Sequence, residues 1–161
     1  MPLLDRQGWK AEDYSREDEA APAVIVPLEA LESTLDARRP GQRVGVDLPN
    51  TALPHALKPV QDRIDLVAID FPLFKDGRGF SIGRMLREQG YKGTLRAKGK
   101  ITPDQFEFAL RCGFDEVELS EEQAARQPIE QWRHGADLFS LHYQNDHDGF
   151  ASIFDRRRAA A

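Results

Sequence analysis

Residues 65–119 alternate short apolar runs with segments of helical periodicity, and this alternation constrains the fold more than any other feature. The apolar runs predict strands at 66–71, 94–97 and 116–119, and the intervening segments predict two helices of about ten residues. Strands joined by helices of this length lie parallel and are connected by right-handed crossovers. The stretch therefore predicts an α/β fold.

The predicted helix ends carry recognisable signals. Ser81 and Thr102 are expected to cap the two helices, with Pro103 in the first turn of the second. Gly90 and Gly113 are expected to end them.

Before this stretch, strands are predicted at 23–28 and 43–48, a short helix at 28–35 and a poorly regular helical segment at 50–64. The chain is therefore expected to form one α/β domain with a mostly parallel sheet of about five strands flanked by helices. An open sheet and part of a (β/α) barrel both fit this pattern. A further helix is expected from Ser120, with helical character continuing through Trp132.

The chain ends are expected to differ from the domain between them. Residues 1–22 are polar and acidic, which predicts a flexible arm with a short hairpin at its start. The α/β domain is expected at 23–144, where 138–144 forms a last strand or a closing turn. Residues 145–161 are expected to be a mobile tail.

Composition excludes several classes of function. The net charge of −5 argues against binding to nucleic acid. No apolar run approaches the roughly 18 residues that cross a bilayer, and the N-terminus lacks a secretory signal. Cys112 is the single cysteine, so one chain makes neither an internal disulfide nor a four-cysteine cluster. We expect a cytoplasmic protein without a membrane partner.

Charged residues gather at or near the carboxyl ends of the predicted strands, where open parallel sheets bind ligands. These residues are Asp47, Asp70, Arg96, Lys98 and Glu118, together with Asp76 and Arg78 in the following loop and Arg84 and Arg87 on its helix. The arginines could hold a small anion through bidentate contacts. The same set could instead be an internal salt-bridge network.

The loop at 75–79 contains Gly77 and Gly79, which can take backbone angles closed to other residues. Its spacing departs from the dinucleotide fingerprint, because Ile82 stands where the third glycine is needed. We expect a glycine loop at a helix N-terminus that binds a simple anion or nothing. His142 and His147 are five residues apart, so no metal site is expected. Cys112 is expected to be a small buried side chain.

Five motifs give the chain a family resemblance between residues 66 and 144. They are FPxFxDGRGFS at 71–81, LRAxG at 95–99, DQ at 104–105, RCGFD at 111–115 and YQ at 143–144. In this order they resemble a bacterial family of unknown function whose members are usually labelled as oxidoreductases involved in sulfite reduction. That label rests on neighbouring sulfite reductase genes, so the resemblance implies a pathway, sulfur assimilation, more than a reaction.

The resemblance implies an accessory or interaction protein that supports the sulfite reductase haemoprotein. Six-electron reduction of sulfite requires haem-type and iron–sulfur centres, which one cysteine cannot supply. No cofactor is predicted, although NADP or a flavin stays open. The DGRGFS loop, with Gly77, Gly79 and Ser81 around Arg78, would form the docking or anion-binding face. Arg84, Arg96, Lys98, Asp104 and Gln105 complete the expected anion- or partner-binding set.

An alternative is an enzyme that acts on a small anionic substrate or uses a reduced nucleotide. In this hypothesis Arg78, Arg96 and Lys98 bind the anion, and Asp70 or Asp76 is the general base. A third hypothesis is that the motifs maintain the fold or a homo-oligomer surface.

Overall fold

The structure is a computed structural model of the 161-residue chain, and it describes residues 1–137. The strand or turn expected at 138–144, the YQ motif and the tail from residue 145 lie outside the described residues.

A mixed sheet organises the described part of the chain, and it has seven strands in the order β2-β1-β7-β6-β5-β4-β3. The five strands β3 to β7 are parallel, while β1 pairs antiparallel with both β2 and β7. The strands are β1 (Leu3–Asp5), β2 (Gly8–Lys10), β3 (Ala23–Pro27), β4 (Arg43–Leu48), β5 (Leu66–Phe71), β6 (Thr94–Gly99) and β7 (Glu116–Glu118). The prediction of an α/β domain with a mostly parallel sheet is confirmed, and the two extra strands come from the N-terminal hairpin.

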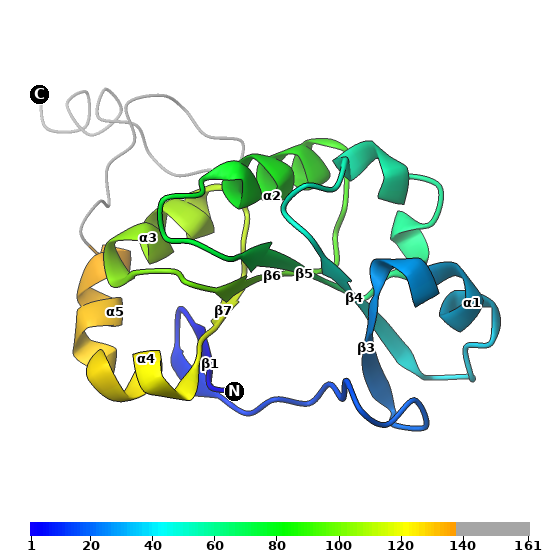
Figure 1. The fold of residues 1–161 in the computed structure, drawn as a ribbon, viewed down its shortest axis with the longest axis horizontal. Helices are drawn as coiled ribbons and strands as arrows, with labels where there is room; N and C mark the ends of the chain where they lie inside the picture. The colour runs from blue at the N-terminus through cyan, green and yellow to red at the C-terminus, as the bar shows by residue number, and fades with distance from the viewer. Residues whose placement is uncertain (138–161) are drawn as a thin grey trace, which may run out of the picture.

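The parallel strands follow one another in sheet order as they do in sequence, so successive crossovers wind in one direction. Figure 1 shows the result: α1, α2 and α3 cover one side of a curved sheet, and the N-terminal segment crosses the other side. The helical elements are η1 (Leu28–Ala30), α1 (Leu31–Asp36), η2 (Pro54–Leu57), η3 (Gln61–Arg63), α2 (Arg78–Glu88), α3 (Pro103–Arg111), α4 (Glu121–Arg126) and α5 (Ile129–Asp137). The arrangement resembles an arc of a (β/α) barrel left open between β2 and β3.

The two faces of the sheet differ in chemistry because side chains alternate along each strand. Val46, Val67, Ile69, Leu95 and Val117 face the helices and belong to the main apolar core. The residues between them face the other way. We call this opposite side the polar face, because most of its side chains on β6 and β7 are charged.

Aromatic rings fill the core beneath α2. Phe71 packs against Phe80 with ring centroids 4.8 Å apart and against Phe114 at 5.9 Å. A Cβ on Gly79 would lie 2.4 Å from the Phe71 ring, and one on Gly83 would lie 2.3 Å from the Phe114 ring. These glycines therefore let α2 approach the aromatic rings closely.

The glycine loop differs from the expectation. Gly77 has φ −79°, and Gly79 is already helical, so neither takes the left-handed angles that favour glycine. The helix starts at Arg78, and Ser81 is an exposed residue inside it rather than its cap. The physical reason is packing: Gly79 must be small to lie over Phe71. Thr102 does cap α3, through a capping box with Gln105, as predicted.

Residues 50–64 form only the two short 3₁₀ turns η2 and η3, which fits the interruptions by Pro54 and Pro59. Asn50 does not cap a helix there. Its side chain instead donates a hydrogen bond to Asp76, 2.8 Å away.

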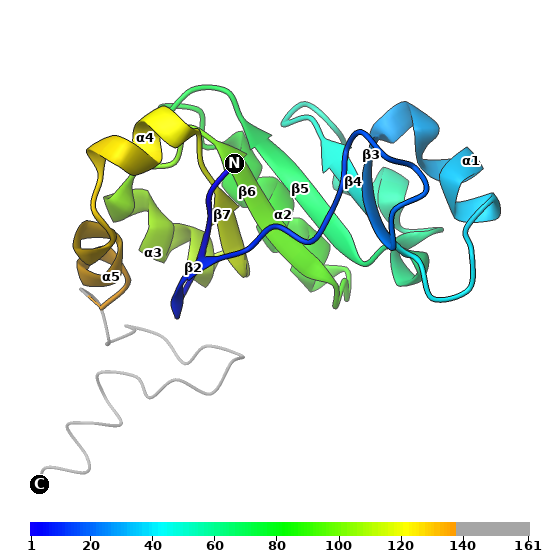
Figure 2. The ribbon, with the colours of Figure 1, turned by 90° about the horizontal axis from the view of Figure 1, so that it is seen from below.

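The N-terminal residues are more integrated than a flexible arm. Leu3 and Leu4 are buried, and β1 extends the sheet along β7. Residues 11–22, which we call the strap, then cross the polar face to β3 (Figure 2). There Ser15 forms a parallel bridge with Val24. None of the helices in residues 1–137 is long and apolar enough to cross a membrane.

We predict that Gly83→Ala destabilises the protein by about 1–3 kcal/mol, because the new methyl group overlaps the Phe114 ring. Thermal unfolding followed by circular dichroism measures the loss. Ser81→Ala, at an exposed position of the same helix, is the control and is expected to change stability little. Equal stability of the two variants would contradict the packing role of Gly83.

Candidate functional site

Arg96 lies at the centre of the polar face and is fully buried. Its Nε donates to Glu116 Oε1 at 2.7 Å, and its Nη1 donates to Glu118 Oε2 at 3.0 Å. Glu12 of the strap accepts from both Nη1 and Nη2, the latter at 3.1 Å. The guanidinium is thus surrounded by three carboxylates from two strands and the strap.

The same network continues toward the carboxyl ends of the strands. Arg16 of the strap donates to Glu118 Oε2 at 2.8 Å and to Asp47 Oδ2 at 2.9 Å. Lys98 Nζ lies 2.9 Å from Asp47 Oδ1 and 2.9 Å from Asp70 Oδ1. Lys98 and Asp70 are partly exposed there, whereas Glu118 is buried.

The shifts in pKa agree with this pairing. Burial alone would raise the pKa values of Glu12 and Asp47. Hydrogen bonds from Arg96 to Glu12, and from Arg16 and Lys98 to Asp47, outweigh burial and lower both pKa values. Burial would lower the pKa of Lys98, but bonds to Asp70 and Asp47 raise it. All three groups are therefore held in their charged forms at neutral pH.

For Arg96 and Lys98, the geometry corresponds to the internal salt-bridge network rather than to an open anion site. The network joins four cations (Lys10, Arg16, Arg96, Lys98) to five carboxylates (Glu12, Asp47, Asp70, Glu116, Glu118). It carries one net negative charge. An incoming anion would have to displace a carboxylate of the protein itself.

The DGRGFS loop forms a second cluster at the carboxyl end of β5. Asp76 accepts from Arg78 Nε at 2.9 Å and Nη2 at 2.6 Å, and from the Arg78 main-chain N–H at 3.2 Å. The Arg78 guanidinium, together with Asn50, holds the pKa of Asp76 well below its usual range. The main-chain N–H of Arg78 at the start of α2 therefore already donates to a carboxylate, and that carboxylate is a weak base.

Other side-chain bonds fix the shape of this loop. Gln105 Nε2 donates to the Phe74 carbonyl at 2.7 Å, which ties the loop to the start of α3. Asp104, in the first turn of α3, is exposed. Leu73 and Phe74 project from the loop with 57% and 54% of their surface exposed, and Leu53 on the preceding connection is exposed as well.

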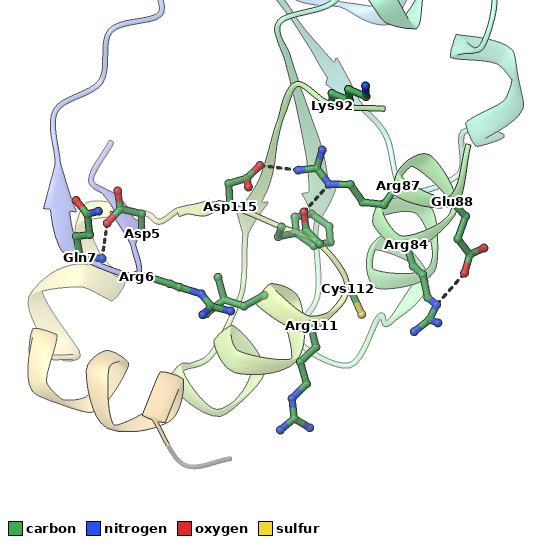
Figure 3. Close-up of a pocket in the computed structure, with 13 residues that line it drawn as sticks. Asp5, Arg6, Gln7, Arg84, Arg87, Glu88, Lys92, Arg111, Cys112 and Asp115 are labelled. Carbon is green, nitrogen blue, oxygen red and sulfur yellow. Dashed lines mark hydrogen bonds and ion pairs between the residues drawn. The ribbon is translucent and has the colours of Figure 1, made fainter. Parts of the chain in front are cut away.

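Arg84 and Arg87 lie away from both clusters. They line a cleft of about 970 Å³ between the C-terminal ends of α2 and α3 and the β1–β2 turn, near the amino ends of β6 and β7 (Figure 3). Arg84 pairs with Glu88 at 3.0 Å. Arg87 pairs with Asp115 at 2.7 Å and donates to the carbonyls of Tyr91, Gly93 and Gly113. Arg87 thus fixes the turns that lead into β6 and β7.

Cys112 lines the same cleft as the C-cap of α3 and is buried. Burial raises the pKa of its thiol, although nearby Arg84 acts in the opposite direction. Within residues 1–137, no group of three or more histidine, cysteine, aspartate or glutamate side chains is arranged to hold a metal ion.

Sequence reasoning missed the strap residues and the exposed apolar tips. Glu12, Tyr14 and Arg16 lie at two-residue spacing, which is the period of an extended segment with one face toward the sheet. That spacing was the available signal. The exposure of Leu73 and Phe74 could not be predicted from the sequence, because apolar residues next to a strand are usually buried in the core.

We predict that Arg96→Met destabilises the protein by about 3–5 kcal/mol, because it removes the buried guanidinium that Glu116 and Glu118 share and leaves them only the partly exposed cations Lys10 and Arg16. Chemical denaturation measures the difference. Arg84→Met, which removes an arginine from an exposed pair with Glu88, is the control and is expected to cost less than about 1 kcal/mol. Similar losses in both variants would show that the buried network does not stabilise the fold.

Comparison with known proteins gives a family. No curated protein matches the chain. A family model described as "Bacterial protein of unknown function (DUF934)" matches residues 45–154, which include β5 to β7, the DGRGFS loop, Arg96 and Lys98 but not the strap. The chain belongs to this bacterial family.

Proposed function

We propose that this chain is an accessory protein of assimilatory sulfite reduction that docks onto the sulfite reductase haemoprotein through the loop after β5. The observation that carries the docking role is the exposed apolar tip of this loop, Leu73 and Phe74, on a backbone fixed from both sides. The identity of the partner comes from the family resemblance of the motifs.

The loop has the properties of a preorganised recognition element. Asn50 and Arg78 hold Asp76 on one side, and Gln105 holds the Phe74 carbonyl on the other. A loop that is already fixed loses little conformational entropy when it binds. Aromatic and large apolar side chains contribute most of the binding energy at protein interfaces, and Phe74 is such a side chain.

The paired state of the cations favours docking over the enzymatic alternative. Arg78, Arg96 and Lys98, the residues expected to bind an anionic substrate, each contact carboxylates of the chain. Asp76, one of the two candidate bases, has a lowered pKa and is a poor proton acceptor at neutral pH. In the docking role the chain needs no redox cofactor of its own, because the reductase supplies those centres. We propose that it acts in the cytoplasm.

We predict that the tagged protein retains sulfite reductase during gentle purification from its native bacterium grown on sulfate. The double substitution L73S/F74S is expected to reduce the retained reductase at least about tenfold, as loss of an interface hot spot does. Quantitative mass spectrometry of the purified complex measures the ratio.

Met85→Ser is the matched control, since Met85 is 48% exposed on α2 outside the loop. It should leave retention unchanged. If the wild-type protein retains no reductase, the proposed partner is wrong. If both variants retain the reductase as wild type does, the proposed docking loop is wrong.

A further inference from the structure

The strap differs from the hairpin that precedes it. Leu3 and Leu4 anchor the hairpin in the core, whereas residues 11–22 include no buried side chain. In Figure 2 the strap runs over the polar face from β2 toward β3. It therefore covers a surface of the sheet and contributes little to the apolar core beneath the helices, against which partly buried Ala21 packs.

Three strap side chains at two-residue spacing contact the polar face, and Asp13 between them pairs with Arg43 of β4 at 2.6 Å. Glu12 binds the Arg96 guanidinium in bidentate fashion, and Arg16 bridges Asp47 and Glu118. Tyr14 lies between them and packs against the small apolar cluster of Ile25, Leu66 and Ala68.

Main-chain groups of the strap add to these contacts, and the carbonyls of Glu19 and Ala21 accept hydrogen bonds from the buried Gln42 side chain. The Ser15 N–H donates to the Ala23 carbonyl at 2.9 Å, and the Ile25 N–H donates to the Ser15 carbonyl at 2.8 Å. Ser15 therefore lies beside β3, at the edge of the sheet, in the way that an added peptide strand does. The strap is bound as an extended peptide ligand would be.

The surface under the strap has the character of a built polar site. Arg96, Glu116 and Glu118 are fully or almost fully buried on it, and one oxygen of Glu118, Oε1, has no hydrogen-bond partner among the described residues. The site extends to the carboxyl ends of β4 to β6, the edge where parallel sheets bind ligands. Without the strap, the polar face would present the Arg96 guanidinium to an acidic side chain. It would also present an apolar patch to an aromatic ring, and the carboxylates of Asp47 and Glu118 to a basic side chain.

We propose that the polar face is a peptide-binding site and that the strap is its built-in occupant. The external ligand is an extended polypeptide segment of a partner, with an acidic residue, an aromatic residue two positions later and a basic residue four positions later. Such a segment replaces Glu12, Tyr14 and Arg16 contact for contact. This surface is separate from the loop after β5, so the inference does not depend on that loop.

Residues 12–16 of the strap are suited to exchange because ion pairs and two main-chain hydrogen bonds provide most of their contacts, whereas Gln42 holds the end of the strap near β3. Glu12 and Arg16 are partly exposed, but their partners Arg96 and Glu118 are buried, so a displacing segment must supply the same charges. The tethered strap still has an advantage over a free peptide, since the tether gives it a high effective concentration. A competing segment therefore binds best when the strap's own anchors are weakened.

The test uses a full-length variant with Glu12→Gln, Tyr14→Ser and Arg16→Gln, and a synthetic peptide of residues 11–17. NMR spectra of the isotope-labelled variant are recorded as the peptide is added. We expect saturable shifts in the amide signals of Val24–Val26, Asp47, Arg96 and Glu118. The wild-type protein is expected to bind the peptide at least roughly tenfold more weakly, because its own strap competes.

A control peptide with the same three substitutions is expected to cause no saturable shifts. The proposal is overturned if the folded variant ignores the wild-type peptide or binds the control peptide equally. It is also overturned if the variant fails to fold, since the strap would then be part of the fold rather than an exchangeable occupant.

Discussion

A buried guanidinium is the interaction on which the polar half of this structure depends. Arg96 is fully buried on β6 and contacts carboxylates from β7 and from the strap. Removing an arginine from water is costly, and only close pairing with good hydrogen bonds compensates for it. The position of Arg96 therefore explains why Glu116 and Glu118 lie on the same face and why Glu12 is drawn across the sheet.

Much of the fold follows from local sequence patterns. The apolar runs predicted β4 and β5 with the bounds that the structure has, and Thr102 with Pro103 predicted the start of α3. These elements are predictable because period, caps and breakers act over a few residues. The predicted start of α2 was wrong because a contact between separate elements decided this helix boundary. Gly79 lies over the Phe71 ring, and a local sequence pattern does not show such a contact.

The candidate site was predictable only in part. Asp47, Asp70, Lys98 and Glu118 were expected near the strand ends because topology alone brings the ends of parallel strands together. Their partners were not expected, since Glu12 and Arg16 come from a segment that composition assigned to a flexible arm. Low apolar content argues against a core segment, but it does not exclude a segment held by ion pairs on a charged face.

We propose different roles for two surfaces of the molecule. The loop after β5 presents Leu73 and Phe74 on a fixed backbone, which suits docking to a folded partner. The polar face suits an extended charged peptide, and its own strap already occupies it. Both roles depend on recognition of a protein partner, and neither requires the paired cations to bind a free anion.

The Arg96 guanidinium is held by carboxylates of the chain, and we infer that it is not available to a small anion. NMR observation of the arginine side-chain Nε–H groups tests it most directly. We predict one slowly exchanging Arg96 Nε–H signal whose chemical shift stays unchanged when sulfate, sulfite or phosphate is added. A rapidly exchanging Arg96 signal, or one that moves saturably with any of these anions, would show that the guanidinium is open to small anions.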